Sequence, residues 1–311
     1  MRLPVPLERV ATECPLAAVH GPSPLLPGPG AFGAGPFAGV LFEIRCCSRC
    51  GLGVTSPLPT PENARALYED RSSDDFQPDD PPAVASLKRY FAGRDAARFA
   101  RYAAGATEVL DFSCGNGAFV RALSRALPGA RVRGSDVHEE PPPGLPAERY
   151  VPFDALDRMP GAFDLVLARH VLEHTYDPVR SLEGLFRLAA PGGVLAIEVP
   201  SLETPLRRLF GPHWDGYYVP YHPLHFTQRS LRLALEAAGF RVVATGGAEM
   251  PKMGRSLRNV LGGRYGPGHF LAGVALHPLQ LLVGSVTRRP VCLRIWGRRP
   301  GGASSPLQAT A

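Results

Sequence analysis

Residues 107–120 read Thr-Glu-Val-Leu-Asp-Phe-Ser-Cys-Gly-Asn-Gly-Ala-Phe-Val, and this stretch decides the fold. Residues 109–112 are mostly β-branched, aromatic or aliphatic, which predicts a buried parallel strand. Gly115 and Gly117 follow, and glycine permits the positive φ angles and close backbone approach of a tight turn. Apolar residues at helical spacing then predict a helix from Ala118 to Leu127. Such a unit opens a doubly wound α/β sheet, whose ligands bind beyond the carboxyl ends of the strands.

The residues around the turn distinguish between two nucleotide cofactors. A dinucleotide fingerprint needs a third small residue after the second glycine, and Val120 stands there. Asp111 would repel a pyrophosphate, but it suits a ligand that carries an ammonium group. Asp136 ends the next expected strand, Arg131–Ser135, about 20 residues beyond the glycines, where an acid binds a ribose diol. A nucleotide-dependent oxidoreductase is therefore the alternative and not the first hypothesis.

The stretch resembles motif I of class I S-adenosylmethionine-dependent methyltransferases, in which an apolar strand precedes D-x-G-x-G-x-G. Ser113 replaces the first of those glycines. The resemblance implies an α/β, Rossmann-like, doubly wound sheet of seven mostly parallel strands. It also implies that an acid after the third expected strand, Arg149–Phe153, approaches the adenine amino group. S-adenosyl-L-methionine would then be bound by Asp111, Ser113, Gly115, Gly117, Asp136, Asp154 and Arg169.

Two later segments carry the candidates for the acceptor side. The fourth expected strand, Phe163–Ala168, continues as Arg-His-Val-Leu-Glu-His, which resembles the F-D-L-V and H-V-L-E-H segments of the same family. Its carboxyl end would face the sulfonium, so His170 would act there as a base or orient the acceptor. A lid insertion brings His222 and His225 in the pattern H-x-x-H-F-T. The catalytic candidates are His170, His222 and His225, although a helix-capping role for His225 is an open alternative.

The other expected elements complete the sheet. The strands Val194–Val199 and Arg241–Ala244 are predicted to be the fifth and sixth. Apolar residues alternate with Arg294 and Trp296 in Val291–Trp296, as in an antiparallel edge strand. We expect helices at 62–68, 83–102, 118–127, 178–189 and 230–238.

A chain of 311 residues exceeds the usual single-domain size, so we expect a core of about 190 residues with additions. No run of 18 apolar residues and no signal peptide is visible, which favours a cytoplasmic protein. The expected units are a degenerate zinc-ribbon-like module at 1–60, a helical cap at 61–105, the methyltransferase core at 106–299 with insertions at 200–227 and 247–289, and a disordered tail at 300–311.

The net charge of +6 is unevenly distributed. Residues 251–311 contain one Lys, eight Arg and no acid, which gives +9 and leaves 6 − 9 = −3 for residues 1–250. No aromatic-interleaved basic motif is visible, so no nucleic-acid partner is expected. The apolar segment 270–286 is too short to span a bilayer. It would pack against the core or a partner, or residues 270–289 would contact a membrane peripherally through Arg288 and Arg289.

Four cysteines lie near the N-terminus. Cys47-Ser-Arg-Cys50-Gly-Leu is a knuckle that can place two thiolates on one metal ion. In related bacterial methyltransferases an earlier C-P-x-C completes the site, but Ala17 replaces its second cysteine here. Cys14, Cys47 and Cys50 are therefore candidate ligands, with His20, Cys46 or water as the fourth. We expect no bound zinc and a relic ribbon of buried thiols.

The resemblance implies methyl transfer to a small-molecule acceptor by in-line displacement at the sulfonium methyl carbon. Whether oxygen, nitrogen or carbon accepts the methyl group stays open. A non-catalytic partner subunit that retains the cofactor fold is a second alternative, because Ser113 and the incomplete cysteine set depart from the family patterns.

Overall fold

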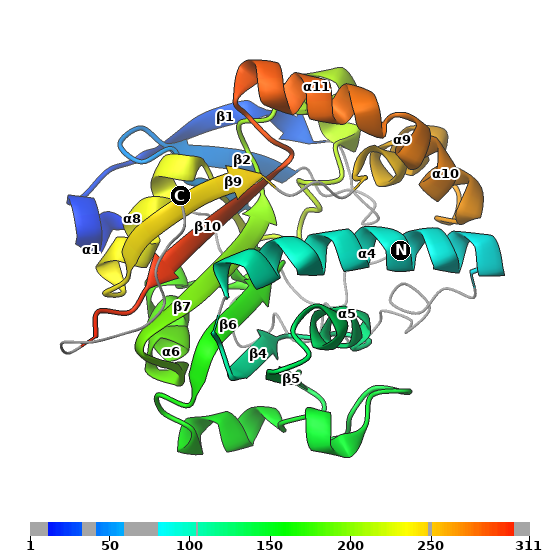
Figure 1. Cartoon of the computed structure of the whole chain (residues 1–311). Helices are drawn as coiled ribbons and strands as arrows, with labels where there is room; N and C mark the ends of the chain where they lie inside the picture. The colour runs from blue at the N-terminus through cyan, green and yellow to red at the C-terminus, as the bar shows by residue number, and fades with distance from the viewer. Residues whose placement is uncertain (1–11, 33–41, 59–79, 104, 248–250, 302–311) are drawn as a thin grey trace.

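The computed structural model of the chain describes residues 12–32, 42–58, 80–103, 105–247 and 251–301 (Figure 1). Part of the expected helical cap and the tail from residue 302 lie outside these ranges. The described residues form a large central sheet and a small second sheet near its carboxyl end.

The central sheet has six strands in the order β5-β4-β6-β7-β10-β9. Its first four strands are parallel, and β10 runs antiparallel to both of its neighbours. This arrangement confirms the doubly wound α/β class. The strands are β4 (Glu108–Phe112), β5 (Arg131–Ser135), β6 (Phe163–Arg169), β7 (Ala189–Pro200), β9 (Arg241–Gly247) and β10 (Cys292–Arg298).

Two predictions about this sheet are wrong. The third expected strand, Arg149–Phe153, is reduced to a single bridge between Gly134 and Tyr150, because short 3-10 helices flank Tyr150 on both sides. The strand predicted at the edge, β10, lies inside the sheet between β7 and β9. Its polar residue Arg294 is therefore buried, and it is neutralised by acids from other elements.

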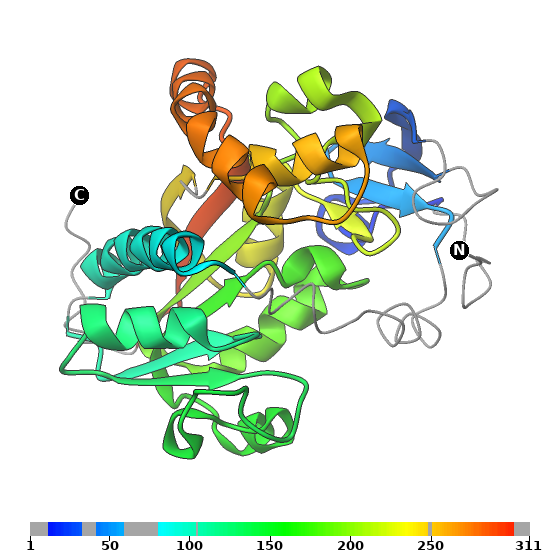
Figure 2. The same ribbon diagram turned by 90° about the vertical axis from the view of Figure 1, so that its right-hand side faces the viewer.

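Helices cover both faces of the central sheet (Figures 1 and 2). On one face, α4 (Pro82–Tyr102) and α5 (Ala118–Ala126) pack side by side, with Phe99 and Phe119 in edge contact. On the other face lie α6 (Pro178–Leu188) and α8 (Gln228–Ala237). Successive strand residues point to opposite faces, so β4, β6 and β7 each contribute to two apolar layers. These layers hold the carboxyl ends of β4, β5 and β6 in place.

The small sheet is antiparallel and combines distant parts of the chain. Its order is β1-β2-β3-β8, and the last strand comes from the expected lid insertion. A one-turn helix, α1 (Ala17–His20), precedes it. The strands are β1 (Leu25–Phe32), β2 (Phe42–Cys47), β3 (Gly53–Ser56) and β8 (Leu224–His225).

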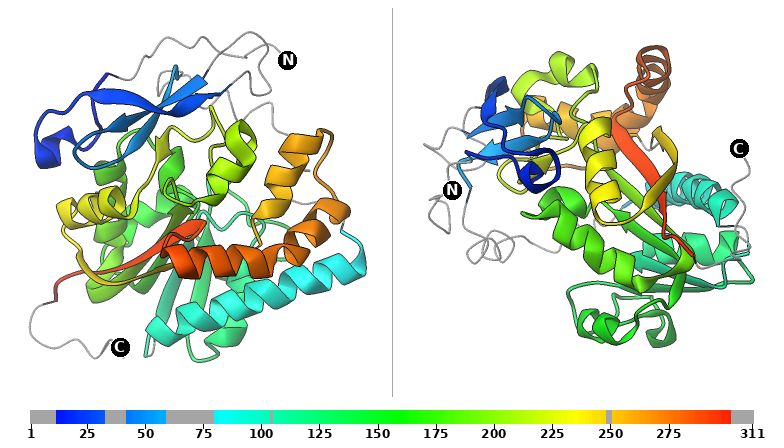
Figure 3. Two further views of the ribbon diagram at one scale, coloured as in Figure 1. Left: turned by 90° about the horizontal axis from the view of Figure 1, so that it is seen from above. Right: turned by 90° about the vertical axis from the view of Figure 1, so that its left-hand side faces the viewer.

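Short helices fill the space between the small sheet and the C-terminal helices (Figure 3). Among the described residues, no single helix is long and apolar enough to cross a membrane. The expected apolar segment is split into α10 and α11, which meet at 46° and pass the length and composition test only as a bent pair. The helices of this region are α7 (Leu206–Phe210), α9 (Met253–Leu261), α10 (Pro267–Ala275) and α11 (His277–Thr287), with the 3-10 turn η5 (Gly211–His213). Elsewhere, the 3-10 turns η2 (Ala147–Arg149) and η3 (Phe153–Arg158) follow β5, and η4 (Leu172–His174) follows β6.

Candidate active site

The turn between β4 and α5 has the backbone that its glycines predict. Gly115 and Gly117 have φ angles of 54° and 69°. Ser113 also adopts a positive φ, 59°, although it carries a side chain. The serine thus keeps the left-handed conformation that glycine would adopt, at a steric cost. No heavy atom lies within 4 Å of the position that a Cβ of Gly115 would occupy, so a ligand can approach this backbone.

Val120, which occupies the third-glycine position of a dinucleotide fingerprint, packs closely against the sheet. This close packing is possible because residue 134 of β5 is a glycine. A Cβ at Gly134 would lie 2.9 Å from Val120 Cγ2 and 2.7 Å from Cys114 Sγ, which is too close. Helix and strand therefore approach each other through a glycine in the strand rather than in the helix.

Asp136 connects the turn to the second strand. Its Oδ2 accepts a hydrogen bond from the Gly115 amide at 2.7 Å, and its Oδ1 accepts one from the Val137 amide at 2.8 Å. Tyr150 Oη donates to the carbonyl oxygen of Asp136 at 3.2 Å. The carboxylate is thereby held at the carboxyl ends of β4 and β5, where the sequence places a ribose-binding acid.

Asp111 is the buried acid of this site, with 3% of its surface exposed. Burial raises the pKa of its carboxyl to about 7, while the Arg169 guanidinium opposes the rise and the Asp136 carboxylate adds to it. A cationic group beside Asp111 would favour its ionised form. A buried acid, an open glycine backbone and a fixed second acid together fit a cofactor that has an ammonium group and a ribose.

Asp154 differs from these residues because it lies exposed in η3. Its neighbour Phe153 is 48% exposed and contacts Phe112, with ring centroids 5.7 Å apart. The two rings border a cavity of about 450 Å³ between η3, α6 and the ends of β4 and β6. Most of its lining is apolar, and Ser113 and His174 reach it from the turn and from η4.

An ionic cluster is buried beneath the carboxyl end of β6. Arg294 of β10 binds Asp95 of α4 at 2.6 Å and Glu198 of β7 at 2.5 Å. Arg169 reaches the same two acids, at 3.2 Å from Asp95 and 3.8 Å from Glu198. Although burial opposes ionisation, the two guanidinium groups hold the pKa of Glu198 well below its usual range. Arg169 thus belongs to this cluster, with its guanidinium 3.7 Å from the Phe119 ring centroid.

His170 lies next to this cluster and is held on both sides. Its Nδ1 is 3.1 Å from Glu173 Oε1, and its Nε2 is 3.2 Å from Glu198 Oε1. Lys252 Nζ lies 3.0 Å from the same Nε2. The backbone of His170 has a positive φ of 56°. With 31% of its side chain exposed, His170 is accessible but strongly oriented.

The two lid histidines are buried. His222 donates from Nδ1 to the Gly216 carbonyl oxygen at 3.2 Å and contacts the His174 ring. Burial, together with nearby His174 and His225, lowers the pKa of His222 well below its usual range. Burial lowers the pKa of His225 to about 3. Both side chains are therefore neutral at pH 7.

His225 joins two neighbouring strands of the small sheet. Thr55 Oγ1 donates to the His222 carbonyl oxygen at 2.7 Å, so it accepts from His225 Nε2 at 2.8 Å. This contact ties β8 to β3 and gives His225 a structural role. The open capping alternative is wrong in detail, because Thr227 and Ser230 cap α8 by bonding each other.

Sequence reasoning missed several members of the acceptor side. Glu198 and Arg294 stand alone as charged residues within apolar strands, and that pattern signals a buried partner. Lys252 and Asp95 carry no local signal, because the fold brings them from other elements. The missed residues are Asp95, Glu173, His174, Glu198, Lys252 and Arg294.

Comparison with known families fits this geometry. The profile of a family described as methyltransferase domain matches residues 84–245, which are 162 of the 311 residues. The chain belongs to the methyltransferase domain family. This assignment confirms the expected class I methyltransferase domain and its cofactor, S-adenosyl-L-methionine. The oxidoreductase alternative finds no support.

Individual relatives of this chain are more distant. Ubiquinone biosynthesis O-methyltransferase of Psychrobacter cryohalolentis is 31% identical over 125 residues, which are 36% of this chain and 48% of the relative. The enzyme of the same name from Pseudomonas putida is 36% identical over 97 residues, covering 28% of this chain and 41% of the relative. The chain spans about half the length of the curated relatives it matches.

Among solved structures, the chain is similar to the 1,6-didemethyltoxoflavin-N1-methyltransferase of Burkholderia thailandensis. The two share 19% identity with a TM-score of 0.48, and the match covers 83% of this chain and 96% of the other.

Proposed function

We propose that this protein transfers a methyl group from S-adenosyl-L-methionine to a small-molecule acceptor. The observation that carries the proposal is the pairing of two acids at one sheet edge, with Asp136 bonded to the Gly115 amide and Asp111 buried beside the same turn. A non-catalytic subunit that no longer bound the cofactor would need neither acid in this arrangement.

Each residue of the cofactor side has a distinct task in this proposal. Asp111 pairs with the ammonium group of the cofactor, which compensates the cost of ionising a buried carboxyl. Asp136 accepts hydrogen bonds from the ribose, and Gly115 lets the cofactor approach the backbone. The cofactor supplies an activated methyl group on its sulfonium. Phe153 borders the apolar cavity, which suits a purine, and the exposed Asp154 is our candidate for the adenine amino group.

The acceptor side lies between the end of β6 and the segment from β7 to α8. There Glu173, Glu198 and Lys252 orient the imidazole of His170. His222 is neutral, so it can orient an acceptor through contacts of its ring but not through a positive charge. Holding the acceptor at near-attack distance can supply about 7 to 11 kcal/mol, so positioning is the main catalytic contribution.

The attacked atom is the finer part of the proposal. Both curated relatives are named as O-methyltransferases. We therefore favour an acceptor hydroxyl, which must lose its proton during transfer. His170 is the candidate for that proton transfer or for orienting the hydroxyl.

Calorimetric titration tests the cofactor site. The parent chain should bind S-adenosylhomocysteine and should not bind NAD. Asp136→Ala should weaken S-adenosylhomocysteine binding by about 1.5 to 3 kcal/mol, the usual contribution of hydrogen bonds to a charged group. Glu148→Ala, which removes an exposed carboxylate from η2, is the matched control and should bind like the parent. Equal affinities in all three proteins would remove Asp136 from the site.

Variants of the histidines test the acceptor side. His170→Ala should leave cofactor affinity within a few-fold and lower kcat by about 10²-fold or more if His170 transfers the proton. His222→Ala and His225→Ala should act mainly through stability. The exposed His213 of η5 provides the control His213→Ala. Parent turnover in His170→Ala, with a hydroxyl acceptor in hand, would place proton transfer elsewhere.

We also propose peripheral contact with an anionic membrane through α11. Leu279, Leu282 and Val286 recur at helical spacing and are 44%, 60% and 75% exposed. Arg288 and Arg289 follow them and are exposed. No acid occurs from residue 251 onward, so nothing in this segment repels anionic headgroups. An apolar helix face beside exposed arginines suits the boundary between acyl chains and headgroups.

Vesicle sedimentation tests this contact. The parent should bind vesicles that contain phosphatidylglycerol and should bind pure phosphatidylcholine weakly. The double variant Leu282→Glu, Val286→Glu should lose that binding, whereas Leu26→Glu, at an exposed site on β1, should keep it. Concentration-dependent dimerisation that the same double variant abolishes would instead assign this face to a second copy of the chain.

A further inference from the structure

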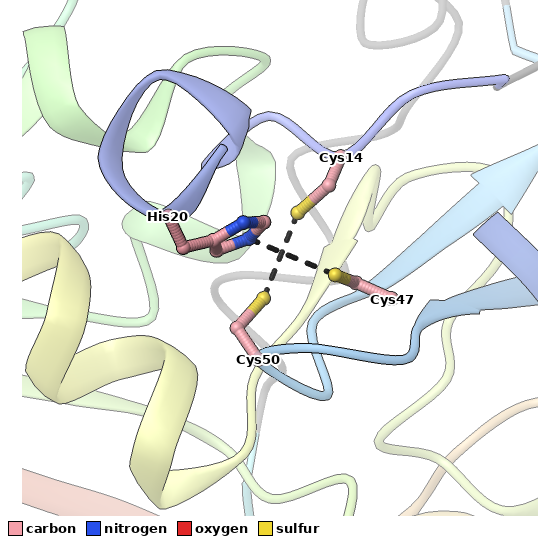
Figure 4. A group of neighbouring side chains, drawn as sticks. All are labelled: Cys14, His20, Cys47 and Cys50. Carbon is pink, nitrogen blue, oxygen red and sulfur yellow. Dashed lines mark hydrogen bonds between the residues drawn. The ribbon is translucent and has the colours of Figure 1, made fainter. Parts of the chain in front are cut away.

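Four metal-ligating side chains converge beside the small sheet (Figure 4). They are Cys14, His20, Cys47 and Cys50, and their ligand atoms all lie within 4.8 Å of one another. Cys14 Sγ is 3.6 Å from Cys50 Sγ, and Cys47 Sγ is 3.7 Å from His20 Nε2. We propose that these residues form a closed Cys3His zinc site. This replaces the expectation of a metal-free relic.

The distances suit tetrahedral coordination. Zinc binds thiolate sulfur at about 2.3 Å and imidazole nitrogen at about 2.0 to 2.1 Å, so neighbouring ligand atoms lie roughly 3.5 to 3.8 Å apart. Both measured separations fall in this range. They also exclude a disulfide, in which the two sulfurs are about 2.05 Å apart. The three thiols are 1% to 3% exposed, so the site is shielded from solvent.

His20 takes the place of the cysteine that the sequence lacks. Ala17 stands at the expected ligand position, and α1 places His20 on the same face one turn later. The Nδ1 of His20 lies 2.7 Å from the Gly21 carbonyl oxygen, which can only accept a hydrogen bond. The proton is therefore on Nδ1, and the lone pair of Nε2 points toward Cys47. A histidine fixed in this tautomer is ready to bind a metal ion.

Polar groups also lie around the cluster. The Leu16 amide lies 3.4 Å from Cys14 Sγ, and Ser23 Oγ lies 3.4 Å from Cys47 Sγ. Arg49, within the knuckle, donates to the His20 carbonyl oxygen and adds a positive charge nearby. Cys46 takes no part, because it faces the other side of β2 and packs into a different apolar cluster.

The site also contacts elements that form the acceptor side. Thr227, which caps α8, donates from Oγ1 to the Cys50 carbonyl oxygen at 3.1 Å. The knuckle leads directly into β3, whose partner is β8. A zinc ion here would therefore fix the base of the segment that carries His222 and His225. Four protein ligands leave no open position, so its role is structural.

Metal analysis of the full-length chain, purified without chelator, tests the inference. Mass spectrometry of the elements should find one zinc ion per chain in the parent and in Cys46→Ser, the matched thiol control. His20→Ala, Cys47→Ser and Cys50→Ser should lose most of it. Iron in place of zinc, or a parent that stays metal-free after refolding with zinc chloride, would overturn the proposal. So would full zinc content in all three ligand variants.

Cobalt substitution of the parent keeps the inference testable if those variants fail to fold. The chain refolded with cobalt should show sulfur-to-cobalt charge-transfer bands and the intense visible bands of a tetrahedral site. Weak absorption typical of octahedral cobalt would overturn the assignment.

Discussion

The cofactor side of this methyltransferase domain is built from neighbouring residues, whereas the acceptor side is built from distant ones. Asp111, Gly115 and Asp136 lie within one strand-turn-helix-strand unit, and their geometry follows from it. On the acceptor side, Arg294 and Asp95 are separated by 199 residues, and Thr55 and His225 by 170. The geometry of the cofactor side therefore follows from a short stretch of sequence. The acceptor side depends on how helices and strands from distant parts of the chain pack together.

The largest expected effect tests the long-range part. Arg294→Ala removes the guanidinium between Asp95 and Glu198 and leaves both carboxylates buried. Breaking such a cluster should cost about 3 to 5 kcal/mol of unfolding free energy. Chemical denaturation measures this, with Arg241→Ala on the exposed part of β9 as the control. A loss no larger than in the control would show that the acceptor side does not depend on the cluster.

A second test compares stability with binding on the cofactor side. The pKa of Asp111 is raised to about 7 in the folded chain, so the folded state holds a proton that the unfolded state releases near pH 4. Stability of the ligand-free protein should therefore fall as pH rises from 4 to 7. Asp111→Asn should abolish this fall and gain up to about 4 kcal/mol at pH 8.

Denaturation curves at pH 5.5 and pH 8, run beside the parent, measure this effect. The same variant should bind S-adenosylhomocysteine poorly, because its amide cannot pair with an ammonium group. A variant that binds like the parent would separate Asp111 from the cofactor, and a parent-like pH dependence would show that another group is responsible.

A third, smaller effect concerns the pairing of β8 with β3 in the small sheet. Thr55→Val removes the hydroxyl that bonds both His225 and the His222 carbonyl oxygen, and it leaves them buried. We expect a loss of about 1 to 3 kcal/mol. Amide exchange at β8 should accelerate while cofactor affinity stays unchanged. If cofactor affinity falls together with stability, the cofactor side and the acceptor side are coupled and do not form independently.

The smallest effect tests the departure from the glycine motif. Ser113→Gly should relieve the strain of a side chain at φ 59° and stabilise the chain by about 0.5 to 1 kcal/mol. Thermal melting measures it, and Ser285→Ala, at an exposed position of α11, is a control for general serine effects. Destabilisation by Ser113→Gly would show that the serine makes compensating contacts.

The sequence alone determined the glycine turn, the parallel strands and the two acids of the cofactor side. Those features depend on short-range rules: β-branched runs form strands, and glycines permit positive φ. The family profile and the topology of β4, β5 and β6 agree with them.

Only the tertiary structure decided which residues contact each other across distant parts of the chain. Only docking shows that β10 is internal, that His225 bonds Thr55, and that His20 completes the cysteine cluster. The physical reason is that burial sets the protonation and role of these side chains, and burial depends on elements far along the chain. A histidine looks the same in the sequence whether it acts as a base, binds a metal ion or makes a structural hydrogen bond.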